Sequence, residues 1–148
     1  MSSGFFISYL YGRIYNMKLS TKARYGTRLM MDLAKHYEEG KPILLSDVSK
    51  RQDITIKYLE KLVRPLKRAG LVKSYRGAKG GYILSRAPSR IRLSEIYATL
   101  EGSTSIVQCI TSKKYCKKYK WCRTRLVWKE IKKSLDKILG GKTLKDLI

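Results

Sequence analysis

Residues 54–84, ITIKYLEKLVRPLKRAGLVKSYRGAKGGYIL, change from one apolar repeat to another. Up to Gly70 the apolar residues recur every three or four positions, which predicts a helix with Thr55 as its N-cap. After Gly70, residues 71–75 alternate with a period of two residues, and a second short apolar run follows at residues 82–84. The stretch therefore predicts a helix followed by a two-stranded hairpin with a glycine-rich turn.

Two more helices are expected before this stretch. The first has Ser20 or Thr21 as its N-cap. The second covers residues 45–51 and has Ser46 as its cap. This order of helix, helix, turn, helix and hairpin is a winged helix-turn-helix. Pro65 lacks a backbone N–H, so we expect it to kink the third helix or to end its regular part.

The second half of the chain adds two helices. One is capped by Ser94 and runs through Leu100, and a longer one runs from Thr124 to the Gly140 and Gly141 pair. The predicted fold class is mainly α with a small β wing, a winged helix-turn-helix followed by a long C-terminal helix.

The charge of the chain limits its possible partners. The 148 residues include 33 Lys and Arg against 11 Asp and Glu, which gives a formal net charge of +22 at pH 7. Such an excess attracts the protein to phosphates or to an anionic membrane surface. No apolar run reaches the roughly 18 residues of a membrane-spanning helix, so we expect double-stranded DNA as the partner and no membrane.

The helix and the hairpin supply the candidate DNA contacts. In this fold the recognition helix enters the major groove with its N-terminal residues at the base edges, and the wing reaches a neighbouring groove. Thr55 and Lys57 can donate to phosphates or guanine, whereas an ionised Glu60 accepts and selects for a cytosine amino group. The full candidate set is Thr55, Lys57, Glu60 and Lys61 on the helix and Arg76, Gly77 and Lys79 on the wing.

All three cysteines of the chain, Cys109, Cys116 and Cys122, lie in one lysine-rich stretch. Their odd number, with no signal peptide ahead of them, favours reduced thiols in a cytoplasmic protein. Their spacing is too long for a zinc knuckle, and thiolates are the ligands that iron–sulfur clusters prefer. Zinc, a reversible thiol–disulfide switch and a set of free thiols on a basic loop remain alternatives.

Several segments together resemble a known family. The stretch MKLSTKARYGTRLMMDLA from Met17, the elements YLEKL, GLV and RGAKGGY, the later LSEI and the three cysteines resemble the IscR-type family of bacterial winged-helix transcription regulators. The resemblance implies a homodimer held by the long helix, bound to a palindromic operator. It implies that Thr55, Lys57, Glu60 and Arg76 contact DNA, and that the three cysteines bind a 2Fe-2S cluster.

The fourth ligand of such a cluster is not identified. Where some family members place a histidine this chain has Arg125, and where others supply a carboxylate from the first helix it has Arg24. Neither arginine can bind iron. The candidates for the fourth ligand are Glu101, a ligand from the second subunit, a water molecule and a small thiol. We expect His36 to be a surface residue.

We expect the chain to divide into three parts. Residues 1–16 are expected to be an N-terminal extension upstream of the natural start at Met17. Residues 17–88 form the DNA-binding domain, and residues 89–148 form the cysteine loop and the dimerisation region.

Three functions are compatible with these features. The first is a DNA-binding transcription regulator that senses iron–sulfur or redox status through its cysteine loop. The second is the same regulator without a cluster, controlled by thiol oxidation or by a partner protein. The third is a basic RNA-binding protein, although RNA-type aromatic motifs are absent. We expect no enzyme, because the sequence has no carboxylate pair, nucleophile motif or phosphate-binding loop.

Overall fold

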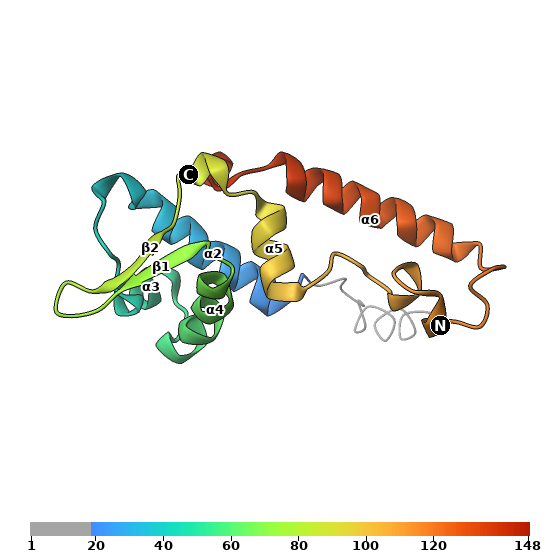
Figure 1. Cartoon of the computed structure of the whole chain (residues 1–148), viewed down its shortest axis with the longest axis horizontal. Helices are drawn as coiled ribbons and strands as arrows, with labels where there is room; N and C mark the ends of the chain where they lie inside the picture. Colours follow the sequence, from blue (N-terminus) through green and yellow to red (C-terminus); the bar gives the residue numbers. More distant parts are fainter. Residues whose placement is uncertain (1–18) are drawn as a thin grey trace, which may run out of the picture.

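The computed structural model describes residues 19–148, so the extension expected at residues 1–16 lies outside the described residues. The molecule is elongated, with the hairpin at one end and α6 along one edge (Figure 1). Its main elements are α2 (Thr21–Lys35), α3 (Leu45–Gln52), α4 (Ile56–Arg68), β1 (Val72–Tyr75), β2 (Gly81–Leu84), α5 (Leu93–Glu101) and α6 (Thr124–Gly141). This order confirms the predicted fold class, mainly α with a small β wing.

Two helices begin with the predicted N-cap. The Ser20 hydroxyl accepts a hydrogen bond from the Ala23 N–H at 3.0 Å, and the Thr55 hydroxyl accepts one from the Tyr58 N–H at 3.3 Å. In both cases the hydroxyl satisfies a backbone donor that the first turn of a helix leaves unpaired.

The caps predicted for α3 and α5 are wrong. Leu44, not Ser46, is the N-cap of α3, and Arg92, not Ser94, is the N-cap of α5. A backbone pairing with a distant segment lies at the start of each helix. Ile43, the residue before the cap of α3, pairs with Tyr82, and Arg92, the cap of α5, pairs with Thr143. These tertiary pairings fix the backbone where the helix starts.

Pro65 does not end α4. The helix continues to Arg68, and the Ala69 N–H still donates to the Pro65 carbonyl at 2.9 Å. The missing N–H of Pro65 removes only one hydrogen bond in the last turn, and the buried apolar face of the helix holds that turn in place.

The wing is an antiparallel hairpin in which Val72 pairs with Leu84 and Tyr75 with Gly81. Backbone hydrogen bonds of 2.8 Å in both directions join Tyr82 to Ile43, so the wing is tied to the segment that leads into α3. The base of the wing is buried at Val72 and Leu84, whereas its tip projects from the body (Figure 1).

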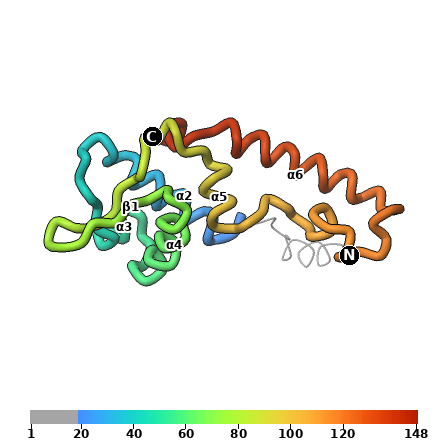
Figure 2. Tube along the Cα trace, viewed as in Figure 1, coloured from blue at the N-terminus to red at the C-terminus, as the bar shows by residue number. Residues whose placement is uncertain are grey.

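One hydrophobic core joins α2, α3, α4, α5 and the base of the wing. Its most buried large side chains are Leu29, Met30, Leu33, Val48, Leu59, Leu62, Leu66, Leu71, Ile91, Ile96, Leu100 and Leu144. Leu144 belongs to the C-terminal segment, which returns to the start of α5 (Figure 2), and the Leu144 N–H donates to the Ile91 carbonyl at 2.9 Å. The C-terminal end of the chain is therefore anchored on the helical domain.

Candidate nucleic-acid interface

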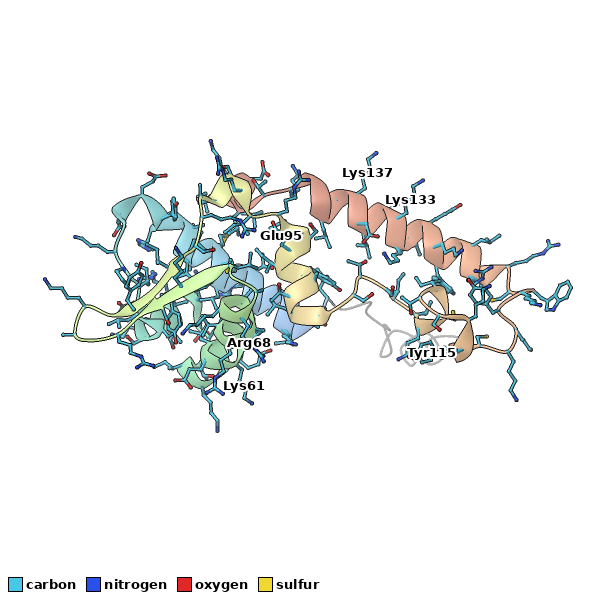
Figure 3. The ribbon with its side chains drawn as sticks, in the orientation of Figure 1. Lys61, Arg68, Glu95, Tyr115, Lys133 and Lys137 are labelled. Carbon is cyan, nitrogen blue, oxygen red and sulfur yellow. The ribbon has the colours of Figure 1, made fainter. Side chains whose placement is uncertain are left out.

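One face of α4 is free for a partner. The four predicted contact residues at its N-terminal end, Thr55, Lys57, Glu60 and Lys61, are all exposed. The opposite face carries Leu59, Leu62 and Leu66 into the core. In Figure 3, Lys61 and Arg68 lie along the edge of the molecule that α4 forms, away from α6. The helix thus presents a polar, mainly basic face to the surroundings.

A buried carboxylate holds the turn that precedes α4. Asp32 on α2 is 2 % exposed and accepts hydrogen bonds from Arg51 Nε at 3.1 Å, Arg51 Nη2 at 2.7 Å and Gln52 Nε2 at 2.9 Å. Arg28, one turn earlier on α2, donates to the Gln52 side chain at 3.1 Å and also to the Gln52 carbonyl. The end of α3 is therefore fastened to α2 by side chains.

Directly after this contact the chain reverses into α4. Asp53 adopts a left-handed conformation with φ 51°, and the Ile54 N–H donates to the Ser49 carbonyl at 3.3 Å. Tyr58, in the first turn of α4, packs edge to face on Tyr25 of α2, with ring centroids 5.8 Å apart. These contacts fix the direction in which α4 leaves the core. Tyr58 and Tyr82 are both partly buried and pack against the core.

Glycines shape the wing at three positions. Gly77 is exposed and has φ +99°, a conformation that other residues rarely adopt. A Cβ at Gly80 would lie 2.5 Å from the Tyr75 carbonyl oxygen, and one at Gly81 would lie 2.5 Å from the Ile43 carbonyl oxygen. Gly80 and Gly81 are thus needed for the internal packing of the wing, and Arg76 and Lys79 are exposed beside them.

A groove between α4 and the wing brings three of the predicted residues together. Glu60 of α4 lines it from one side, and Arg76 and Gly77 of the wing line it from the other. Thr55, Lys57, Lys61 and Lys79 lie outside the groove, on the exposed surface. The predicted set missed the other lining residues, of which Lys67 and Tyr75 carry large polar side chains. Lys67 follows Glu60 by seven positions, which places both on one face of the helix, and this spacing is the signal that could have found it.

The cysteine segment lies between α5 and α6, at the end of the molecule opposite the wing (Figure 1). It contains two short 3₁₀ turns, Gln108–Ile110 and Lys113–Tyr115. Cys109, Cys116 and Cys122 are half-buried free thiols. Within residues 19–148, no three His, Cys, Asp or Glu side chains gather into a group that could hold a metal ion.

Cys122 has the most distinct surroundings of the three. Its Sγ lies 3.1 Å from the Thr124 hydroxyl, just before the start of α6. That hydrogen bond, with further ones from the backbone of Arg125 and Thr124 and the charge of Arg125, lowers the pKa of the Cys122 thiol. These groups favour the thiolate, the form that binds metals.

The positions considered for a fourth iron ligand have other contacts. The Arg125 guanidinium lies 3.9 Å from the ring centroid of Tyr119, and Arg24 lies 5.6 Å from that of Tyr25. Glu101 accepts a hydrogen bond from the Ser20 hydroxyl, and His36 lies 2.7 Å from Glu39. The donor chemistry of the segment thus fits three of the four ligands of a cluster.

The long helix α6 exposes apolar side chains along its length. Leu126, Val127 and Ile138 are exposed by 56 %, 51 % and 61 %, and none of its residues is buried. Half-buried Ile131 and Leu135 continue the pattern at helical spacing. Within residues 19–148, the helix packs mainly on α5 and the Gln108–Ile110 turn, and its exposed apolar side chains are not covered by these elements.

Residues 19–148 match the family Rrf2, described as "Iron-dependent Transcriptional regulator". The chain therefore belongs to the Rrf2 family. The transcriptional regulator CymR of Bacillus subtilis is 42 % identical over 131 residues, 88 % of this chain and 89 % of CymR. Protein rrf2 of Nitratidesulfovibrio vulgaris is 39 % identical over 132 residues, 89 % of this chain and 87 % of that protein. The solved structure of T. potens IscR superposes with a TM-score of 0.75 at 40 % identity, over 90 % of this chain and 87 % of IscR.

Membership of the Rrf2 family confirms the IscR-type resemblance and the winged-helix fold. The protein is a DNA-binding transcription regulator and not an enzyme, as predicted. In the described part of the chain, none of the helices has the length and apolar character needed to cross a membrane.

Proposed function

We propose that this Rrf2 regulator acts in the cytoplasm as a homodimer that binds an inverted-repeat operator with one winged helix per half-site. The observation that carries the proposal is the groove lined by Glu60 on α4 and by Arg76 and Gly77 on the wing. A recognition helix and a wing that border one groove can contact adjacent grooves of the same duplex.

Each predicted contact residue has a separate role in this proposal. Thr55 and Lys57, at the N-terminal end of α4, contact base edges or phosphates in the major groove, and Lys61 contacts the phosphate backbone. Glu60 accepts from a cytosine amino group. Arg76 enters the minor groove, where a narrow groove strengthens the negative potential that attracts the guanidinium. Gly77 allows the wing backbone to approach the DNA closely, and Lys79 contacts the phosphates.

The variant Arg76→Ala tests the role of the wing. Loss of a groove-reading arginine is expected to reduce the affinity for the operator by about tenfold or more, with a smaller effect on random duplex. Lys145→Ala, at an exposed cation outside the groove, is the control. An equal loss of affinity for operator and random DNA would remove Arg76 from the residues that read sequence.

The uncovered apolar surface of α6 supports dimerisation. The helix has 18 residues and is about 27 Å long, and its exposed Val127 and Ile138 lie in one apolar stripe with half-buried Ile131 and Leu135, as expected of a paired helix. Pairing places two copies of α4 at a fixed separation, which an inverted repeat then matches. In this division, residues 17–88 bind DNA and residues 89–148 pair the subunits and carry the cysteines.

We propose further that Cys109, Cys116 and Cys122 hold a 2Fe-2S cluster. Three thiols within one segment provide soft ligands, and the Thr124 hydroxyl and Arg125 favour the thiolate of Cys122. A bound cluster supplies a one-electron redox couple. Cys109 lies in a turn that packs on α6, and Cys122 lies just before α6. Drawing these thiols together therefore orders the segment that adjoins the pairing helix.

Iron and acid-labile sulfide content after oxygen-free purification tests the cluster. The proposal predicts both elements, with visible absorption that disappears when the three cysteines are replaced by serine. The absence of iron and sulfide, together with unchanged operator affinity of the triple-serine variant in reducing and oxidising conditions, would contradict it.

A cluster-free regulator is the second candidate. It is favoured by Arg125 and Arg24 at the positions where a fourth ligand is expected, and by the separate placement of the three thiols within residues 19–148. It predicts metal-free protein whose operator affinity changes with thiol oxidation or with a partner protein.

A further inference from the structure

The cysteine segment carries a concentrated positive charge. Residues 103–123, here called the basic loop, contain no Asp or Glu. Its cations, Lys113, Lys114, Lys117, Lys118, Lys120 and Arg123, are all exposed. Within residues 19–148, none of these side chains lies within 4.0 Å of a carboxylate. The loop therefore presents a concentrated and uncompensated charge.

Cation–π contacts form around Tyr119 of the loop. The Arg125 guanidinium lies 3.9 Å from the ring centroid and Lys113 Nζ lies 5.9 Å from it, so two cations lie near this ring. Trp121 is 86 % exposed and Tyr115 is 62 % exposed beside the lysines. The loop thus exposes two aromatic side chains among its cations.

The basic loop and α4 face the same edge of the molecule. Tyr115 on the loop lies toward the edge where Lys61 and Arg68 project, whereas Lys133 and Lys137 project from the opposite edge, formed by α6 (Figure 3). Along the long axis, α4 lies between the wing and the loop (Figure 1). A duplex that docks on α4 and the wing is therefore on the side of the molecule that the loop faces.

We propose that the basic loop is a second DNA-contacting surface, which binds the phosphate backbone of the operator duplex on the far side of α4 from the wing. The inference rests on the proposed function, because α4 must first dock on duplex DNA. Once α4 has docked on the duplex, the nearby phosphates have a high effective concentration at the basic loop. The loop lysines then increase the affinity for DNA without a preference for its sequence. The loop then links the state of the cysteines directly to DNA affinity.

The salt dependence of DNA binding tests this contact. The double variant Lys117→Gln and Lys118→Gln removes two cations from each subunit of a dimer. If all four contact phosphates, the slope of log K against log salt becomes shallower by about 3.6 on operator and random duplex alike. The matched control, Lys133→Gln with Lys137→Gln, makes the same change in charge on the opposite edge and is expected to leave the slope within about 1 of the parent value.

Trp121 provides a second readout within the loop itself. The chain has two tryptophans and eleven tyrosines, so Trp128→Phe leaves Trp121 as the sole tryptophan, which can be excited selectively at wavelengths where tyrosine does not absorb. Addition of operator duplex is expected to change the Trp121 emission at low salt and to restore it at high salt. A loop that instead binds an acidic protein predicts unchanged slopes and unchanged emission, and that result would overturn the proposal.

The outcomes separate this inference from the proposed function. If the parent protein prefers an inverted repeat and the loop variants leave the slope unchanged, only the loop contact is wrong. If the parent protein shows no preference for any duplex sequence, the operator proposal is wrong.

Discussion

The guanidinium of Arg51 on α3 forms a bidentate salt bridge with the buried carboxylate of Asp32 on α2. Nη2 donates to Oδ1 at 2.7 Å and Nε donates to Oδ2 at 3.1 Å. Gln52, the last residue of α3, completes the contact and leads into the turn before α4. The orientation of the recognition helix is thus set by a polar contact two helices away from DNA. Asp32 and Arg51 are not among the residues proposed to contact DNA, so this contact can be perturbed without removing one of those residues.

Asp32→Asn is expected to lower the free energy of unfolding by about 2 kcal/mol, because a buried charged acceptor loses its ionic hydrogen bonds. The Arg51 side chain is 39 % exposed and can recover water, which keeps the cost below that of a fully buried pair. Urea denaturation measures the change in the free energy of unfolding. Lys50→Ala, at an exposed residue of α3 next to Arg51, is the control. Operator affinity is expected to fall more than affinity for random duplex, and an unchanged denaturation midpoint would contradict this role of Asp32.

The contribution of Asp32 is expected to depend on pH. Burial alone raises the pKa of Asp32, but hydrogen bonds from Arg51 and Gln52 and the charge of Arg51 together hold it below the ordinary value of 3.8. A carboxyl whose folded-state pKa is lowered stabilises the fold above its unfolded pKa, and this stability is lost as the pH falls through the folded value. The difference in unfolding free energy between the parent and Asp32→Asn should therefore shrink between about pH 5 and about pH 2. A constant difference across that range would show that Asp32 is not ionised in the fold.

Gly81→Ala is expected to destabilise the protein by about 2 kcal/mol. The new Cβ would meet the Ile43 carbonyl oxygen, and the φ of +139° at this position disfavours any side chain. Because the wing is tied to Ile43 through Tyr82, displacement of Gly81 also weakens operator binding. Gly140→Ala in α6, where a Cβ meets nothing within 4 Å, is the control and should be neutral or stabilising by up to about 1 kcal/mol. Equal effects of the two substitutions on the thermal midpoint would refute the packing role of Gly81.

Val127→Asp with Ile138→Asp is expected to convert a dimer into a monomer. Both side chains are more than half exposed in the single chain, so the charges cost little within one subunit but oppose the pairing of two apolar helices. Sedimentation analysis measures the mass, and Lys129→Asp with Lys133→Asp on the same helix is the control. A double Asp variant that remains dimeric would place the interface elsewhere.

Local signals in the sequence predicted most of the fold. The periodicity of residues 54–84 and the hydroxyl caps at Ser20 and Thr55 depend on neighbouring residues only, and the structure confirms them. The predicted caps at Ser46 and Ser94 are wrong because the pairings of Ile43 with Tyr82 and of Arg92 with Thr143 decide where those helices begin. Such pairings join distant segments and leave no local pattern.

The candidate site was predictable to a similar degree. Basic residues, glycines and helix order indicated α4 and the wing, but not that Lys67 and Tyr75 line the groove with them. The contact of Asp32 with Arg51 was also missed, because an acidic residue on a helix gives no sign in the sequence that it is buried. The roles of the individual DNA contacts and of the cysteines stay predictions.

The most direct test is selection of bound sequences from a random duplex pool, with the parent protein and Arg76→Ala compared at one salt concentration. We expect the parent to enrich an inverted repeat with two equivalent half-sites, and Arg76→Ala to lose selectivity at the wing position of each half-site while keeping the bases read by α4. A pool that remains random after selection with the parent protein would contradict sequence reading by α4 and the wing.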